Sequence, residues 1–207
     1  MVAMIYTQAL FVIADSGYLR GAGVMLAFLR TFVSRRRFVR LRMGWVEVVC
    51  TFEPLVLLAV TYLVQTSTVP VLSPTLGQLS AAVLGAVMAL TGWALLAWSF
   101  ISWRSLFAGH GLLPDHQLVT RGAYGFVRHP VYLAALLIWL GLAVGFQSTP
   151  AFLVTGVYVI PIYFLYIRSE EEMMLEAFGD AYRAYRREVP MLIPRLVRTT
   201  PTPRTAP

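Results

Sequence analysis

The chain has 207 residues, of which 58% are hydrophobic and only 13% are charged, and its mean hydropathy is +0.69. Soluble domains carry about 25% charged residues, so this composition excludes an ordinary soluble domain and indicates an integral membrane protein. The formal net charge of +7 comes from seventeen arginines and no lysine, grouped between apolar segments. We therefore attribute the charge to membrane topology rather than to nucleic acid binding. The lone cysteine, Cys50, excludes an internal disulfide, and no zinc-type cluster of ligands occurs.

The apolar pattern predicts an all-α, polytopic protein with about five transmembrane helices and a C-terminal cytoplasmic helix. Residues 2–33 are expected to form one irregular first span, or a re-entrant helix followed by a short span. The expected break is a group of polar and small residues, namely Asp15, Ser16, Gly17 and Arg20. Five arginines within residues 34–42 then indicate a cytoplasmic loop by the positive-inside rule.

The second predicted span, residues 46–69, carries Glu53 directly before Pro54. An acidic residue within a span is a candidate functional group, here for the substrate. Snorkelling, or pairing with an arginine of the preceding loop, explains it equally well.

The third span, residues 76–103, contains no charge and has small residues at three- and four-residue spacing, which favours close helix packing. A long polar segment precedes the fourth span, residues 131–146. Residues 147–150 connect it to the fifth span, residues 151–167. So short a connection predicts an antiparallel helical hairpin.

Arginines follow spans one, three and five but not spans two and four. This alternation predicts an outside N-terminus and places the polar segments in the cytoplasm. We divide the chain into N-terminal spans (1–75), a core (76–197) and a disordered tail (198–207). A polar helix is expected from Arg168 to about Glu188.

The most informative stretch is Arg128-His129-Pro130, at the start of the fourth span. Proline fits the first position of a helix, so Arg128 and His129 lie at a helix N-terminus that favours anions. The predicted hairpin brings Glu170 and Glu171 to the same membrane face. Separate cationic and anionic pockets there suit a zwitterionic amino-acid group, such as the methionyl part of S-adenosylmethionine. Alternatively, Arg128 is an interfacial arginine, and the glutamates form a charged first helical turn.

Two motifs in this order resemble the isoprenylcysteine carboxyl methyltransferase family and the related phospholipid methyltransferases. The first is LVTRGAY at 118–124, followed by VRHPVYL at 127–133. The second has the acidic pair followed by Phe178-Gly179, Tyr182, Tyr185, Val189-Pro190 and Ile193-Pro194. The resemblance covers about residues 80–197. The departures are Ala123, Ala134 and Met174, and Tyr166 stands where many members have arginine, with Arg168 nearby.

This resemblance implies S-adenosylmethionine as cofactor, no metal, and methyl transfer to a lipophilic acceptor. It implies that Arg128 and His129 act in catalysis, with Arg128 neutralising a carboxylate. Tyr166 and Arg168 become candidates for orienting the substrate, together with Glu53. The implied cofactor-binding residues are His116, Leu118, Val119, Gly122, Tyr124, His129, Tyr132, Glu170 and Glu171.

The acceptor is expected to be a prenylcysteine-like carboxylate, with a phospholipid amine or a small thiol as alternatives. An amine would need a base, and His129 or a glutamate would be the first candidates. A membrane sterol-type reductase using a nicotinamide cofactor and a non-catalytic membrane protein are the other classes weighed. Tyr182 and Tyr185 are expected to pack rather than react. The arginine-rich composition suggests a bacterial inner-membrane protein.

Overall fold

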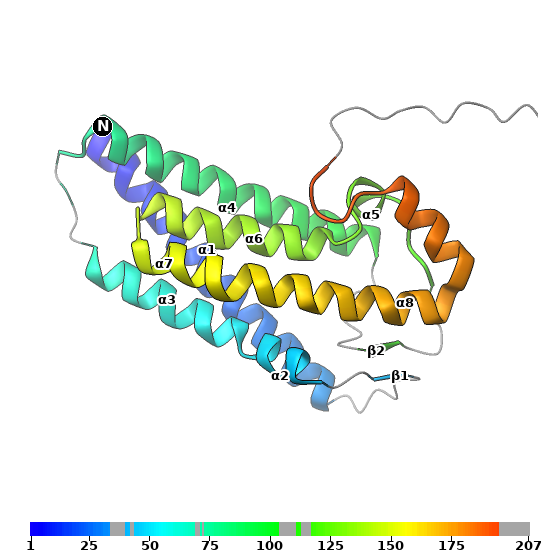
Figure 1. The fold of residues 1–207 in the computed structure, drawn as a ribbon. Helices are drawn as coiled ribbons and strands as arrows, with labels where there is room; N and C mark the ends of the chain where they lie inside the picture. Colours follow the sequence, from blue (N-terminus) through cyan, green and yellow to red (C-terminus); the bar gives the residue numbers. More distant parts are fainter. Residues whose placement is uncertain are drawn as a thin grey trace, which may run out of the picture.

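The structure is a computed structural model that describes residues 1–33, 40–41, 44–68, 71, 73–103, 111–112 and 117–194. Its long helices lie side by side in one bundle, which confirms the all-α prediction (Figure 1). The helices are α1 (Val2–Val33), α2 (Trp45–Thr51), α3 (Glu53–Ser67), α4 (Leu76–Ser102), α5 (Ala123–Phe126), α6 (Pro130–Gly145), α7 (Thr149–Val154), the π-helical turn η1 (Thr155–Val159) and α8 (Ile160–Glu188).

A two-residue antiparallel pairing joins β1 (Arg40–Leu41) to β2 (Gly111–Leu112). These two segments follow α1 and α4 along the chain, and their pairing lies at one end of the bundle (Figure 1). The predicted disordered tail and His116 lie outside the described residues.

Among the described residues, three helical stretches are long and apolar enough to cross a membrane: Val2–Leu26, Leu76–Ser102 and Thr149–Glu188. The apolar helix α6, Pro130–Gly145, is shorter, and α3 has 15 residues. Helices therefore occupy all five predicted segments, whereas the count of five spans stays a prediction.

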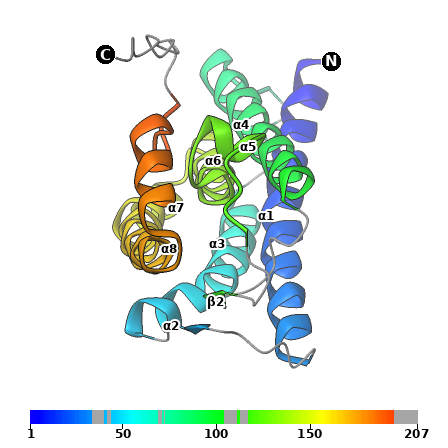
Figure 2. The ribbon, with the colours of Figure 1, turned by 90° about the vertical axis from the view of Figure 1, so that its right-hand side faces the viewer.

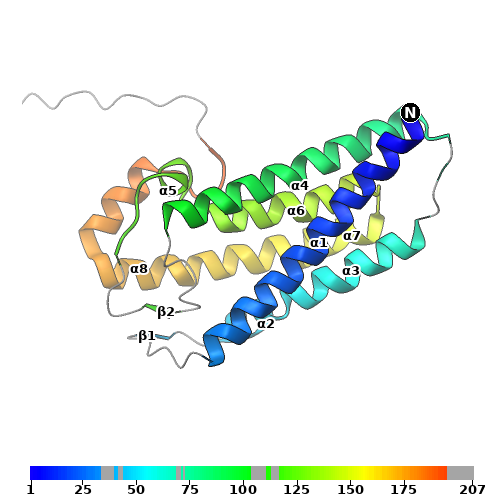
Figure 3. The same ribbon diagram turned by 180° about the vertical axis from the view of Figure 1, so that it is seen from behind.

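The predicted break in the first span is wrong, because α1 runs without interruption through residues 15–20. The polar groups there find partners that keep the helix intact. Ser16 donates its hydroxyl to the Val12 carbonyl at 2.7 Å, and Gly17 lies directly against the Thr61 side chain of α3. α1 crosses the back of the bundle at an angle to α4 (Figure 3).

Helices α4 and α6 pack closely through small residues. A Cβ atom added to Gly85 would lie 2.6 Å from the Gly141 carbonyl oxygen and 2.6 Å from the Gly145 Cα atom. Such contacts let two backbones approach without a polar driving force, which is how apolar helices associate in lipid. The α4–α6 pair fixes the helix that begins with Pro130.

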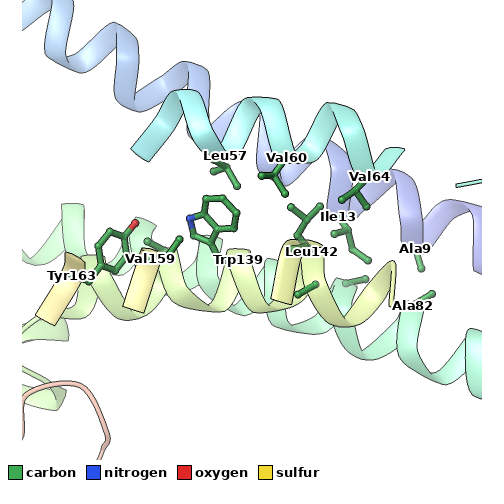
Figure 4. Packing of buried hydrophobic residues seen from close by; sticks show 14 of the residues in the cluster. Ala9, Ile13, Leu57, Val60, Val64, Ala82, Trp139, Leu142, Val159 and Tyr163 are labelled. Atoms are coloured by element: carbon green, nitrogen blue, oxygen red, sulfur yellow. The ribbon is translucent and has the colours of Figure 1, made fainter. Parts of the chain in front are cut away.

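The bundle interior is filled by buried side chains from α1, α3, α6 and α8. Ile13, Leu57, Trp139 and Leu142 are almost fully buried, and Trp139 points from α6 toward α3 (Figure 4). The interior between α1, α3 and α6 is therefore packed with side chains.

The fifth segment and the polar helix after it are continuous rather than separate elements. The wider turn η1 precedes Pro161, whose missing N–H cannot join a regular helical ladder. Further along, Gly179 adopts φ 52° and ψ −121°, a conformation suited to glycine. This kink turns the end of α8 back toward α5 (Figures 1 and 2).

Candidate active site

The backbone before α6 is held by the segment that follows α8. The Arg128 N–H donates to the Pro190 carbonyl at 2.8 Å, and the His129 N–H donates to the Met191 carbonyl at 3.1 Å. Pro130 then begins α6, where its missing N–H leaves no bond unmade. The two family-like motifs are thus joined directly through their backbones.

The Arg128 side chain reaches both α8 and its C-terminal end. Its Nε donates to Glu171 Oε1 at 2.8 Å, and its Nη1 donates to the carbonyls of Arg186 and Val189. A cation is favoured at a helix C-terminus, where carbonyls lack helical partners. Arg128 therefore fastens the returning end of α8 to the start of α6.

His129 and Arg186 complete a five-residue group with Arg128, Glu170 and Glu171, which we call the hairpin-mouth cluster. His129 Nε2 lies 3.2 Å from Glu171 Oε1, and its Nδ1 lies 3.6 Å from Glu170 Oε2. Arg186 Nε lies 3.3 Å from Glu171 Oε2. Glu170 and Arg186 have side-chain exposures of 34% and 40%, against 8% or less for the other three, so a ligand reaches these two most easily.

The acidic partners control the protonation of His129. Burial opposes its protonation, but the close contacts with the Glu170 and Glu171 carboxylates and their negative charges outweigh burial. The pKa of His129 consequently lies above its ordinary value, which favours the imidazolium form. Burial, reinforced by Glu170, also raises the pKa of the Tyr124 hydroxyl, which keeps that group neutral.

The prediction of two separate pockets of opposite charge needs correction. The structure brings Arg128 and Glu171 to one end of the bundle, but it pairs them directly at 2.8 Å. Buried opposite charges pair because an isolated charge there carries a large desolvation penalty. A zwitterionic ligand must therefore exchange partners with an existing ion pair.

Aromatic rings extend from the cluster along α6 and α8. The Tyr132 ring lies 5.8 Å from His129, 5.4 Å from Tyr163 and 5.7 Å from Tyr166, measured between centroids. On the other side, the Tyr185 hydroxyl donates to the Tyr124 carbonyl at 2.7 Å. Tyr132 therefore lies between the charged cluster and the bundle interior.

The remaining predicted cofactor residues lie around α5. Gly122 precedes this helix with φ 63° and ψ −133°, and a Cβ atom there would collide with the Ser102 hydroxyl. The neighbouring Ala123 N–H donates to that same hydroxyl at 3.0 Å. Leu118 packs against the buried cluster formed by Tyr182, Tyr185 and Val189, and Val119 is half-buried.

The three substrate candidates separate in space. Tyr166 is buried, and its ring packs against that of Tyr132, whereas Arg168 is exposed on α8. Glu53 lies deeper in the bundle and pairs with Arg20 of α1 at 2.6 Å. The loop arginines proposed as its partners belong largely to residues outside the described part of the chain.

Sequence reasoning missed Arg186 and Arg20. Arg186 reaches Glu171 only because the chain turns at Gly179, and the glycine in the Phe178-Gly179 motif was the available signal for that turn. Arg20 was interpreted as part of a helix break. Two opposite charges in separate apolar segments, Arg20 and Glu53, were the signal for a buried pair.

Among the described residues, no group of three or more His, Cys, Asp or Glu side chains is arranged to hold a metal ion. The fold and the cluster define a polytopic helical membrane protein with an ionic site at the mouth of a helical hairpin. Residues 80–181 match the phospholipid methyltransferase family. This segment contains Arg128, His129, Glu170 and Glu171, so most of the cluster lies in the part of the chain that matches that family.

Individual relatives are similar to this chain over part of its length. The protein-S-isoprenylcysteine O-methyltransferase of Schizosaccharomyces pombe is 35% identical over 39% of this chain and 34% of its own length. The methanethiol S-methyltransferase of Mycobacterium tuberculosis is 40% identical over 34% of this chain and 28% of its own length. Methanethiol S-methyltransferase 1 of Bradyrhizobium diazoefficiens is 38% identical over 34% of this chain and 24% of its own length. The matches thus span about a third or less of each relative.

Proposed function

We propose that this chain is an integral membrane methyltransferase that moves a methyl group from S-adenosylmethionine to a lipophilic acceptor. The observation that carries the proposal is the hairpin-mouth cluster, in which Arg186 meets an arginine, a histidine and two glutamates of the segment that matches the methyltransferase family. We further propose that the cluster faces the cytoplasm of a bacterial cell, with the N-terminus outside, from the distribution of arginines between loops.

The charged side chains of the hairpin-mouth cluster fit the amino-acid part of this cofactor. A ligand carboxylate can pair with Arg186 or Arg128, and a ligand ammonium can pair with Glu170 or Glu171. Because each charged side chain keeps an opposite charge after such an exchange, binding leaves none of them buried and unpaired. Leu118, Val119, Gly122, Tyr124 and Tyr132 then provide apolar and backbone surface for the adenosyl part.

The cofactor supplies an activated sulfonium methyl group, so the protein's task is alignment and exclusion of water. With its amino-acid part held by the hairpin-mouth cluster, the cofactor would supply this methyl group to the acceptor atom. Alignment of this kind is worth about 7–11 kcal/mol of the barrier. The raised pKa of His129 favours a proton donor over a base, which suits an acceptor that is already ionised, such as a carboxylate.

A second acceptor class, a small thiol, is favoured by two of the relatives, which are both methanethiol S-methyltransferases. A thiol has an ordinary pKa of about 8.5 and must lose its proton before or during transfer. Glu170 is then the first candidate base, because it is the more accessible glutamate of the cluster.

Ligand binding and methyl transfer test the proposal separately. Thermal unfolding in detergent should shift upward with S-adenosylhomocysteine and not with NADPH. A tritiated-methyl assay with membrane lipids, prenyl thiols and short thiols should then identify the labelled acceptor. Glu171→Gln should abolish the shift, whereas Glu172→Gln, an exposed neighbour, should keep it. A shift with NADPH alone would instead support the reductase class.

A further inference from the structure

A second ionic cluster lies inside the bundle, away from the hairpin mouth. Arg20 Nη1 donates to Glu53 Oε1 at 2.6 Å, and Arg20 Nη2 donates to the Tyr163 hydroxyl at 2.8 Å. The Trp139 indole N–H donates to the same Glu53 oxygen. These four residues, which we call the intramembrane cluster, come from α1, α3, α6 and α8 and are all buried.

In the predicted topology, in which α6 begins at the membrane surface, this cluster lies near the depth of the bilayer centre. Trp139 is nine residues beyond Pro130, so it lies about 13 Å along α6 from the helix start. Half of a hydrocarbon core is about 15 Å thick. Buried ion pairs can often be replaced by apolar residues without loss of stability, so we expect this pair to have a role besides folding.

A continuous row of rings connects the two clusters. Tyr163 meets Tyr132 edge-on, with an interplanar angle of 68°, and Tyr132 packs against His129. The Tyr163 hydroxyl and the Trp139 nitrogen both point toward α1 and α3 (Figure 4). The intramembrane cluster therefore lies on the far side of Tyr132 from the hairpin-mouth cluster and closes the bundle interior there.

We propose that the intramembrane cluster is the floor of the acceptor site and limits the length of the acceptor's apolar part. This inference depends on the proposed methyltransferase function and specifies its substrate class. An alkyl chain extending from the hairpin mouth between α6 and α8 meets Tyr132 and Tyr163, and then Trp139. Tyr163 and Trp139 cannot swing aside without giving up hydrogen bonds to Arg20 and Glu53, whose charges then lose partners in an apolar environment. Short apolar acceptors fit above this floor, whereas prenyl or long acyl chains do not.

The test measures methyl transfer to thiols of increasing length, from methanethiol through butanethiol and octanethiol to farnesyl thiol, in one detergent. The wild-type protein should methylate the short members and discriminate against the long ones by about 10-fold or more, the scale of misfit in an apolar pocket. Trp139→Ala should raise the ratio of long-chain to short-chain transfer by about the same factor, because it opens the floor. Trp139→Leu, a milder truncation, should raise it in the same direction.

Leu142→Ala is the matched control. Leu142 is equally buried on α6, one turn beyond Trp139, so its truncation loosens the same core but leaves the floor closed. The ratio should stay at the wild-type value in this variant. Equal transfer to farnesyl thiol and methanethiol by the wild-type protein would overturn the floor, as would an unchanged ratio in both Trp139 variants.

Failure of the proposed function gives a different result. In that case no thiol is methylated and S-adenosylhomocysteine produces no thermal shift, whichever variant is used. If the protein binds S-adenosylhomocysteine and methylates long-chain thiols as well as short ones, the proposed function stands and only the proposed floor is contradicted.

Discussion

The two ionic clusters of this chain have the same central contact but different surroundings. Each contains an arginine and a glutamate in direct contact, at 2.8 Å for Arg128–Glu171 and 2.6 Å for Arg20–Glu53. The hairpin-mouth cluster adds partly exposed groups and ends at a helix C-terminus. The intramembrane cluster adds only the Tyr163 hydroxyl and the Trp139 indole, both buried.

This difference separates a site that can exchange partners from one that cannot. At the hairpin mouth, Glu170 and Arg186 are reached by solvent, so a charged ligand can replace one internal pair by two new ones. Inside the bundle, no water compensates for a broken pair. We therefore assign ligand binding to the first cluster and steric limitation to the second.

The largest expected effect is that of Arg128→Ala. This change removes the contact to Glu171 and the anchors on the Arg186 and Val189 carbonyls. Methyl transfer should be abolished, and the protein should lose about 3–5 kcal/mol of stability, as for a buried pair with one partner removed. Tritiated-methyl transfer and thermal unfolding in detergent measure the two losses.

Arg183→Ala is the control for this change, because Arg183 is an exposed arginine of α8 that pairs locally with Asp180. It should cost less than about 1 kcal/mol and leave transfer intact. Near-normal transfer by Arg128→Ala would contradict the role of the hairpin-mouth cluster.

The next largest effect is on stability, when one or both charged residues of the intramembrane cluster are replaced by leucine. Arg20→Leu alone should cost about 3–5 kcal/mol, because Glu53 keeps a buried charge without its cation. The double variant Arg20→Leu/Glu53→Leu should recover most of this stability, as measured by thermal unfolding in the same detergent. A double variant no more stable than the single would show that the pair itself holds the fold.

A smaller effect is expected from Gly122→Ala, which probes the support of α5. An added Cβ atom would occupy a backbone conformation at φ 63° and ψ −133° that L-residues avoid, and it would displace the Ser102 hydroxyl. The cost should be about 1–3 kcal/mol by thermal unfolding. Gly23→Ala, in α1 with open space around its Cβ position, should be neutral or stabilising.

The smallest effect is the pH dependence due to His129. Because its folded-state pKa is raised, its contribution to stability is complete below the unfolded-state pKa of about 6.5 and is lost as pH rises through the folded value. The melting temperature should thus decline with rising pH more in the wild type than in His129→Gln. Arg128 and Arg186 still neutralise Glu171 at high pH, which keeps this decline modest. Parallel curves for the two proteins would contradict the assignment.

The sequence by itself determined the helical segments and the meeting of the two motifs. Apolar runs without charge and prolines at helix starts, such as Pro130, depend on local chemistry that one stretch of chain contains. The short connection between α6 and α7 was enough to predict that Arg128 and Glu171 share one end of the bundle. These features follow from neighbours in the chain.

The tertiary structure alone decided which charges pair and what lies between the clusters. Arg20 and Glu53 are 33 residues apart, and Arg128 and Glu171 are 43 apart. Their direct contact depends on how α1, α3, α6 and α8 pack. The continuity of α1 past Asp15 and the return of α8 at Gly179 likewise depend on partners supplied by other helices or on a single backbone angle. Pairing of charges is a property of packed surfaces, because each buried charge takes whichever opposite group the packing brings near.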